Sequence, residues 1–459
     1  MLNSPRAVAR RTSPLLQTIF GVAVLLTALL AHPQLAHAAT TWNVTPSSAC
    51  TLADAITASN TAATSGSCAA GSGSGTGVIN LAAGTYTLSA NLPQISTHAL
   101  SIVGAGVGNT IIDGSNLYKV FLDGTGALSN VSDLTILHAG NGGSGIGEAI
   151  FAESNPFTIS NVVVKDSTVD GGLQIAAFSA TISNVAVINN QANAYALSLG
   201  FTNGTYNVSN LTIYNNQHGM YINPNGSGTI NLTNITSSGN GVGIFYQIGG
   251  GSPTVNLKNS ILNDSTACAG DTVTSQGHNI TADNSCGFVG TSNHNNTDAA
   301  LGSLTASSGT YVLPITYTSP AYDAGDSTGA PSTDQRGVSR PQCDGVDIGA
   351  YETTTCAPAP PAGGGGGNNN NSGGSGGTTT KKTTPTTTAP DTTTTPTTTT
   401  PTATTDTTTS DSAKPSISKG ATTTTTHATS HTTLIWSAVA VLLLGAGGTG
   451  WWWFIKHHK

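Results

Sequence analysis

The sequence predicts an all-β protein whose folded part is a parallel β-helix, or solenoid. Three observations support this. A short Asn-containing phrase returns about every two dozen residues. Each copy opens an alternating apolar run closed by Asn, Asp or Gly, without helical spacing. The chain then changes abruptly to a Thr-rich tract and ends in a long apolar run. A self-similar period of this length indicates stacked coils, here with three short strands each.

The repeated asparagines are separated by 23, 26, 24 and 25 residues. Parallel, in-register stacking places them above one another, where each amide can bond to the amide of the next coil. We therefore interpret them as a structural ladder, and a ligand-binding row is the alternative. A second row, Asn190, Asn216 and Asn240 between Ser167 and Ser265, marks the next corner of the coil. The predicted ladder consists of Asn161, Asn184, Asn210, Asn234 and Asn259.

The composition describes a β-rich, weakly charged, exported protein. Of 459 residues 56 are Gly and 8% are charged. Five of the 14 basic residues lie near the two ends, which leaves 9 basic against 21 acidic residues between Thr40 and Thr433, a net charge of −12. Such a surface repels phosphate backbones, so nucleic acid is not an expected partner. Six cysteines in an exported chain predict disulfides.

Residues 1–38 have the three parts of a secretory signal peptide. Arg6, Arg10 and Arg11 precede an apolar run, and Ala36-His37-Ala38 is a small-residue cleavage site. A retained N-terminal anchor is the alternative. Because the apolar run is short for a membrane span, cleavage is the favoured interpretation.

Residues 39–76 are expected to cap the N-terminal end of the solenoid. The segment from Cys50 to Cys68 reads as a short amphipathic helix with Leu52, Ala55 and Ile56 on one face, which would cover open strand edges. Cys50-Thr51-Leu52-Ala53-Asp54-Ala55 resembles the Cys-Ser-Leu-Arg-Glu-Ala motif that opens many secreted bacterial β-helix proteins. This chain departs from that motif at Thr51, Ala53 and Asp54.

The β-helix itself is predicted for residues 77–265. Its first coils read as strands of four to six residues separated by Gly or Asn/Asp-Gly turns. The phrases Gly84-Thr85-Tyr86 and Thr110-Ile111-Ile112-Asp113-Gly114 also look like the first coils of right-handed parallel β-helices of the pectin-lyase-like class. That resemblance implies a right-handed solenoid.

Residues 266–356 are predicted to form a C-terminal cap region, where the periodicity is lost and charge returns. The phrases Ser319–Gly325, Thr333–Pro341 and Asp347–Glu352 look like the C-terminal signature of choice-of-anchor Q bacterial surface proteins. That resemblance covers residues 42–353 and implies a β-helix followed by an anchor, without established catalytic residues. By hypothesis the disulfides are Cys50–Cys68, Cys268–Cys286 and Cys343–Cys356.

The two arginines of the mature chain lie among carboxylates in this region. The same residue types would serve an active site or a cap held by bidentate Arg–carboxylate pairs, and we favour the cap. The predicted cap residues are Asp323, Asp334, Arg336, Arg340, Asp347 and Glu352.

The remaining chain is expected to hold the folded part at a membrane. Residues 357–433 are a Gly/Asn-rich and then Thr/Pro-rich tract that cannot bury a core, and they predict a disordered stalk. Residues 434–455 span roughly 33 Å as a helix, which matches a bilayer core, and residues 456–459 form a basic cytoplasmic tail. The expected location is the bacterial cell surface with an extracellular ectodomain. A lipid anchor with a discarded tail is the alternative.

Catalytic candidates are few. A lyase needs carboxylates for calcium and an Arg or Lys base, and a hydrolase needs clustered carboxylates. The solenoid segment contains no arginine, so no catalytic set is assigned. No cofactor and no metal site are predicted. The weak catalytic candidates are Glu148, Glu153, His138 and His218.

These observations predict a monomeric surface adhesin or glycan-binding module. Its partner would be an extracellular glycan or a host or neighbouring cell surface. The alternatives are a polysaccharide lyase or glycoside hydrolase and a passive surface-layer spacer. Repeated tyrosines suit sugar faces and are expected on the outer surface. These are Tyr195, Tyr206, Tyr214, Tyr221 and Tyr246.

Overall fold

The computed structural model describes residues 39–141, 148–154, 156–168, 171–190, 195–200 and 203–359. The predicted signal peptide, the predicted stalk beyond residue 359, the predicted transmembrane helix and the tail lie outside these ranges. Within the described ranges there is no helix long and apolar enough to cross a membrane.

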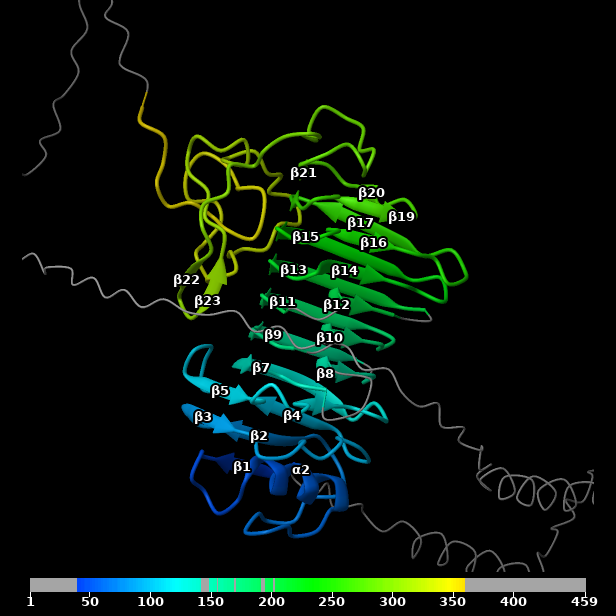
Figure 1. Ribbon diagram of the computed structural model, residues 1–459, viewed down its shortest axis with the longest axis vertical. Coiled ribbons are helices and arrows are strands. Elements are labelled where there is room, and N and C mark those ends of the chain that lie inside the picture. The colour runs from blue at the N-terminus through cyan, green and yellow to red at the C-terminus, as the bar shows by residue number, and fades with distance from the viewer. Residues whose placement is uncertain are drawn as a thin grey trace, which may run out of the picture. The chain divides into compact units, whose positions relative to one another are not determined.

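The described chain is a parallel β-solenoid, stacked coil on coil (Figure 1). Each full coil contributes one long strand, which is bent near its middle, and one short strand. The long strands form one 14-stranded sheet, together with shorter strands near both ends of the solenoid that correspond to only one half of a long strand. Its main strands are β1 Thr41–Val44, β2 Gly77–Leu81, β4 Leu100–Val103, β7 Leu128–Leu137, β9 Phe157–Lys165, β11 Ala180–Ile188, β13 Thr205–Tyr214, β15 Thr229–Ser238, β17 Thr254–Lys258 and β20 Thr274–Ser275.

The bend divides that sheet into two faces. The second halves of the long strands align with β3 Gly84–Thr87, β5 Thr110–Asp113, β18 Ile261–Asn263 and β21 Ile280–Thr281. We name the first halves the first face and the second halves the second face. The third face is a seven-stranded sheet of β6 Phe121–Leu122, β8 Glu148–Ala152, β10 Gly171–Ile175, β12 Tyr195–Leu199, β14 His218–Ile222, β16 Ile244–Tyr246 and β19 Cys268–Gly270.

The bend between the first and second faces explains the repeated asparagines. At this corner the backbone is left-handed, and Asn is the non-glycine residue that tolerates this conformation best, together with Asp. Asn161, Asn184 and Asn210 have φ of 53°, 56° and 52°. Asp133 takes the same position one coil earlier, with φ of 61°. The repeat is therefore set first by backbone geometry.

Side-chain bonds along this corner form a ladder over part of its length. Asn161 Nδ2 donates to Asp133 Oδ1 at 2.9 Å, Asn184 Nδ2 to Asn161 Oδ1 at 3.1 Å, and Asn210 Nδ2 to Asn184 Oδ1 at 3.0 Å. The next asparagine, Asn234, does not continue it. Within the described residues, Asn210 Oδ1 is buried without a hydrogen-bond partner.

The expectation of one continuous ladder through Asn234 and Asn259 is therefore wrong. Asn234 Nδ2 donates instead to the carbonyl oxygens of Asp347 and Gly349, at 3.2 and 2.9 Å. Asn259 Nδ2 donates to Asp326 O at 2.8 Å. The physical reason is that C-terminal backbone covers this corner and offers carbonyl acceptors that compete with the next coil's amide.

A second, buried row satisfies backbone groups at the corner between the second and third faces. Asn190 Oδ1 accepts from Ser167 N at 3.0 Å, and Asn216 Oδ1 accepts from Asn190 N at 3.0 Å. Asn240 Oδ1 accepts from Asn216 N at 2.8 Å. The row ends at Asp264, whose Oδ1 accepts from Asn240 N at 2.9 Å, rather than at the expected Ser265. These side chains bind N–H groups that the turn would otherwise bury unpaired.

The core is a continuous apolar column inside the coils. Inward positions repeat in register, as in Ile159, Ile182, Val208 and Leu232, each of which is at most 1% exposed. Burial of such side chains stabilises the fold by about 1.5–3 kcal/mol each relative to exposure. Exact stacking of apolar residues on apolar residues makes any register shift costly.

The N-terminal end is covered by the expected helix, α2 (Leu52–Thr61). Thr51 caps it, since its Oγ1 accepts from Asp54 N at 3.1 Å. Leu52, Ala55 and Ile56 are buried against the first coil. The solenoid begins earlier than residue 77, because β1 pairs in parallel with β2.

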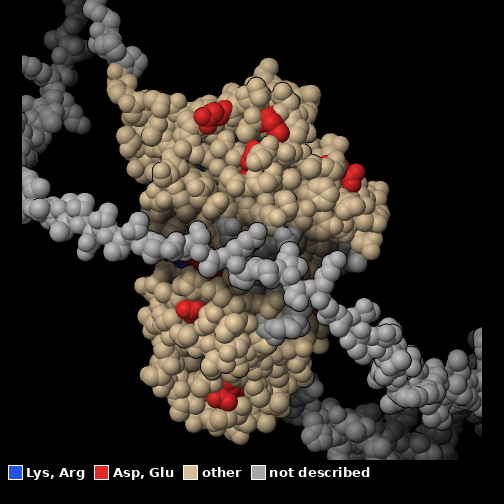
Figure 2. Space-filling view, viewed as in Figure 1, with Lys and Arg blue, Asp and Glu red and all other residues tan. Residues whose placement is uncertain are grey.

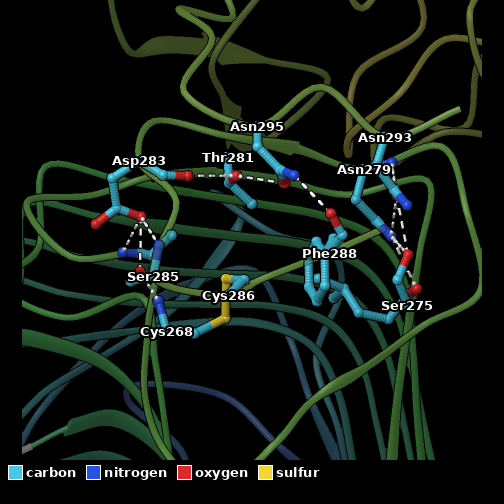
Figure 3. The surroundings of a disulfide bond; sticks show 12 residues. Cys268, Ser275, Asn279, Thr281, Asp283, Ser285, Cys286, Phe288, Asn293 and Asn295 are labelled. Carbon is cyan, nitrogen blue, oxygen red and sulfur yellow. Dashed lines mark hydrogen bonds between the residues drawn. A yellow bond between two sulfur atoms is a disulfide. The ribbon is translucent and has the colours of Figure 1, made fainter. Parts of the chain in front are cut away.

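The C-terminal end lies beyond residue 265, because β20 and β21 add further rungs. Figure 3 shows the Cys268–Cys286 disulfide beside Phe288, which is 6% exposed and packs on the last coil. Asn295 Nδ2 holds this loop by donating to Phe288 O at 2.6 Å. The loop from residue 282 to 297 therefore covers this end.

Residues 298–356 do not lie across the end, as a cap would. They run along the flank of the solenoid, beside β15, β13, β11 and β9 (Figure 1). Their hairpin, β22 Thr305–Ser307 and β23 Thr310–Val312, packs Tyr311 on Val163 and Ala186 of the second face. We call residues 298–356 the flank segment. Tyr311 also lies under the ammonium group of Lys165 in β9, which is 5.3 Å from its ring centroid.

All three hypothetical disulfide pairs are present. Cys50–Cys68 lies beside the N-terminal helix, Cys268–Cys286 at the far end, and Cys343–Cys356 closes the flank segment. Closing a loop of this size stabilises a fold by roughly 3 kcal/mol through the unfolded state.

Replacement of Asn216 by Ala should destabilise the protein by roughly 3 kcal/mol, because Asn190 N loses its acceptor inside the protein. Asn207→Ala is the matched control, since Asn207 is exposed and accepts only a side-chain bond from Asn231. Thermal unfolding of both variants measures the difference. Equal melting temperatures for the two would contradict the role of the buried row.

Asp264→Asn should stabilise the protein at pH 7.5 but not at pH 4. Burial raises the pKa of Asp264 to about 6, above its ordinary value of 3.8. The wild-type carboxyl therefore contributes stability below pH 3.8 that is lost as pH rises through about 6, whereas Asn stays neutral. We expect a gain on the order of 2 kcal/mol at pH 7.5. Melting temperatures across pH 4–8 test this, and a pH-independent shift would contradict it.

Candidate functional site

The third face carries a strip of aromatic side chains from three successive coils. Tyr195 in β12, Tyr221 in β14 and Phe245 in β16 are half-buried and point outward. Parallel pairing sets Tyr221 beside Phe245, whereas Tyr195 pairs with His218. Because β-strand side chains alternate between faces, the residues on either side of Tyr221 and Phe245 point into the core or lie buried at the corner.

The rings of this strip lie nearly parallel. Tyr195 and Tyr221 are stacked with centroids 4.9 Å apart and planes 21° apart. Tyr221 and Phe245 are 5.7 Å apart at 14°, and Tyr195 and Phe245 are 6.1 Å apart at 9°. The ring of His218 packs against Tyr195 at 5.0 Å. We call Tyr195, His218, Tyr221 and Phe245 the aromatic strip.

A shallow groove of about 310 Å³ borders the strip at Tyr221. Its polar lining consists of Gln174, Ser198 and Asn223 from neighbouring coils. Tyr221 Oη also donates to Gln247 Oε1 at 3.2 Å, which fixes that ring. A flat apolar surface beside neutral donors and acceptors suits a sugar ring, whose faces are apolar and whose edges carry hydroxyl groups.

Charged side chains are sparse on the viewed face of the molecule. Figure 2 shows scattered acidic side chains on an otherwise largely uncharged surface.

Two of the five tyrosines expected on the outer face are buried, so that expectation was wrong for them. Tyr206 is 0% and Tyr246 is 2% exposed. Both rings point inward, and their hydroxyls donate to backbone carbonyls, Ala177 O for Tyr206 and Pro253 O for Tyr246. Tyr214 packs beside the flank segment. Only Tyr195 and Tyr221 belong to the aromatic strip.

The Arg–carboxylate residues lie together in the flank segment. Arg340 Nη1 donates to Glu352 Oε2 at 2.6 Å, and both side chains are 1% exposed. Arg336 binds Asp334 through Nε at 2.8 Å and Nη2 at 2.6 Å, and stacks on the Tyr351 ring. The Arg336–Asp334 contact uses two guanidinium nitrogens on one carboxylate oxygen, the Arg340–Glu352 contact uses one nitrogen, and both pairs are buried.

The carboxylates of this cluster are occupied by backbone N–H groups. Glu352 accepts from Asp347 N and Gln342 N, and Asp347 accepts from Thr353 N and Asp323 N. Burial raises the pKa of Asp347 to about 6 and also raises the pKa of Glu352. Asp323 Oδ1 accepts from Gly345 N. Since these carboxylate oxygens accept hydrogen bonds from N–H groups of the flank segment itself, the cluster stabilises the fold of that segment.

The weak catalytic candidates do not form one site. His138 Nδ1 lies 3.1 Å from Asp113 Oδ1 at the corner after the second face. Glu153 is exposed past the end of β8, and its N–H binds Asp123 Oδ2. The side chain of Glu148 is outside the described part. His218 belongs to the aromatic strip. Among the described residues, no three His, Cys, Asp or Glu side chains are grouped closely enough to hold a metal ion.

Reasoning from the sequence missed Phe245 and the role of His218. The spacing gives only part of the signal, because Phe245 follows Tyr221 by 24 residues and is its strand partner, whereas Tyr195 pairs with His218, 23 residues further on. Their common face became visible only with the strand registers.

Comparison with known proteins assigns no family to this chain. Neither a protein-family model nor a curated protein matches the chain. The crystal structure of pectate lyase Pel9A is similar at 14% identity, over 68% of this chain and 96% of that chain, with a TM-score of 0.34. At that level of similarity, no property of the enzyme is transferred to this chain.

Glu352→Gln should loosen the flank segment, because it leaves the buried Arg340 guanidinium without its charge partner and sets an amide N–H against a backbone donor. The expected cost is roughly 3 kcal/mol. Asp344→Asn is the control, since Asp344 is exposed. Limited proteolysis within residues 298–356 measures the effect. Identical cleavage rates for the two variants would show that the pair does not hold the segment.

Proposed function

We propose that this protein is a surface-exposed glycan-binding protein that takes part in adhesion. The observation that carries this proposal is the aromatic strip, three stacked rings from successive coils beside a polar groove. Stacked rings on a rigid sheet present a pre-organised platform, which lowers the entropic cost of binding.

The compactness of the strip defines the ligand class. Coils are spaced by the parallel-strand distance of about 4.8 Å, yet the rings of Tyr195 and Phe245, two coils apart, have centroids only 6.1 Å apart, so the three rings form one compact cluster. A neutral polysaccharide can pack one sugar ring of its chain against this cluster. Gln174, Ser198 and Asn223 would then bind hydroxyl groups at the edge of the chain.

The proposal includes a place at the cell surface. The signal-peptide, stalk and membrane-helix patterns of the sequence support a folded part held outside the bacterium on an extended stalk. The C-terminal phrases that resemble choice-of-anchor Q proteins support the same arrangement. The flank segment, which Asn210, Asn234 and Asn259 bind to the solenoid through its backbone carbonyls, would join the stalk to the binding module.

Replacement of Tyr195 and Tyr221 by Ala should weaken glycan binding at least about tenfold, because two stacking platforms are removed. The full chain, purified in detergent, is tested for retention on a panel of immobilised neutral and acidic polysaccharides. Tyr317→Ala is the matched control, since Tyr317 is 43% exposed and lies in the flank segment.

Three outcomes would contradict the proposal. No retention on any polysaccharide would favour a passive spacer. Retention that survives the double variant would place binding elsewhere. The release of new reducing or unsaturated ends from the same panel would show a hydrolase or a lyase instead of a binding protein.

A further inference from the structure

A second groove, on a different part of the solenoid, borders the uncovered stretch of the asparagine row. Its volume is about 320 Å³. Asp133, Asn161 and Asn184 line it on the solenoid side, and Thr310 and Arg336 of the flank segment line it on the other. It lies where the flank segment stops covering the row, because the next rung, Asn210, is already bound to Thr333 O.

The covered part of the row shows what these asparagines bind. Asn210 Nδ2 donates to Thr333 O at 2.9 Å. Asn234 Nδ2 donates to Gly349 O at 2.9 Å. Asn259 makes a two-point contact with the backbone of Asp326, donating from Nδ2 to its O at 2.8 Å and accepting at Oδ1 from its N at 3.0 Å. All of these partners are peptide-backbone atoms, so the asparagines bind this segment without contacting its side chains through these bonds.

The uncovered asparagines have the same local geometry and spare capacity. Their φ angles of 53° and 56° match the 52° of Asn210. An amide group carries two N–H donors. In the described part of the chain, Asn161 and Asn184 each use one of them within the row, whereas Asn210 uses its second for Thr333 O. The groove thus presents two N–H donors one coil apart, with the Asp133 carboxylate as an acceptor.

We propose that this groove binds an extended peptide segment of a partner protein through its backbone. The partner segment would carry small, uncharged side chains, because the groove is narrow and its two charged residues, Asp133 and Arg336, are of opposite sign. A peptide is favoured over a saccharide because the chain's own peptide occupies the neighbouring rungs of the same row. The proposal does not depend on the aromatic strip.

The test uses the full chain and the labelled hexapeptide Gly-Asn-Ser-Thr-Gly-Ala, which copies residues 325–330, the segment bound at Asn259, with Asn in place of Asp326 so that the peptide is uncharged. Fluorescence anisotropy measures binding to the wild type and to the Asn161→Gly, Asn184→Gly double variant. Glycine keeps the left-handed backbone and removes only the amides. We expect about tenfold weaker binding for the double variant, from the loss of two hydrogen bonds.

Asn189→Gly is the matched control, because Asn189 is also left-handed, with φ of 55°, but lies in another row. It should bind the peptide like the wild type, and so should the Tyr195→Ala, Tyr221→Ala variant. The proposal is overturned if the hexapeptide does not bind at millimolar concentration, or if Asn189→Gly weakens binding as much as the double variant. It is also overturned if a soluble oligosaccharide, but not the peptide, requires Asn161 and Asn184.

Discussion

One constraint organises the middle of this molecule: at the corner between the first and second faces, from Asp133 to Asn259, each coil turns through a left-handed residue at the same place. Only Gly, Asn and Asp take that conformation readily, and Asn also offers an amide that can bond to the coil above or below. Asp133, Asn161, Asn184 and Asn210 meet both demands. The turn fixes the bend between two faces, and the bend fixes which residues point inward.

The same side chains also serve as a dock for peptide backbone. Where the flank segment lies against the row, Asn234 and Asn259 do not bind the neighbouring asparagine. Their side-chain amides donate to backbone carbonyls of the flank segment instead. The buried Arg340–Glu352 pair then closes that segment on itself. An asparagine of this row can therefore bind peptide backbone wherever its second side-chain N–H is not used for a bond within the row.

Binding surfaces on such a solenoid follow from the rules of stacking. The second face is covered by the flank segment, and the interior is filled by an apolar column. Outward positions on the third face remain accessible, and there the strand register places Tyr221 beside Phe245, while the ring of Tyr195 packs on Tyr221 from the neighbouring coil. A rigid scaffold can therefore present a ligand surface built from several coils without any dedicated loop.

The sequence by itself determined the repeat, the solenoid and the capping helix, because these depend on local backbone preference and on short separations along the chain. The cysteine pairs were a hypothesis that the structure bears out. It did not determine which tyrosines face outward. Tyr206 and Tyr221 both lie in alternating strands, and only the register shows that one ring enters the core. Nor could it show that residues 298–356 lie along the flank, since their contacts with Asn210, Thr212 and Thr236 join residues more than 100 positions apart. Turn conformation depends on residues that are neighbours in the sequence, whereas which face of a strand is exposed depends on packing between residues far apart in the sequence.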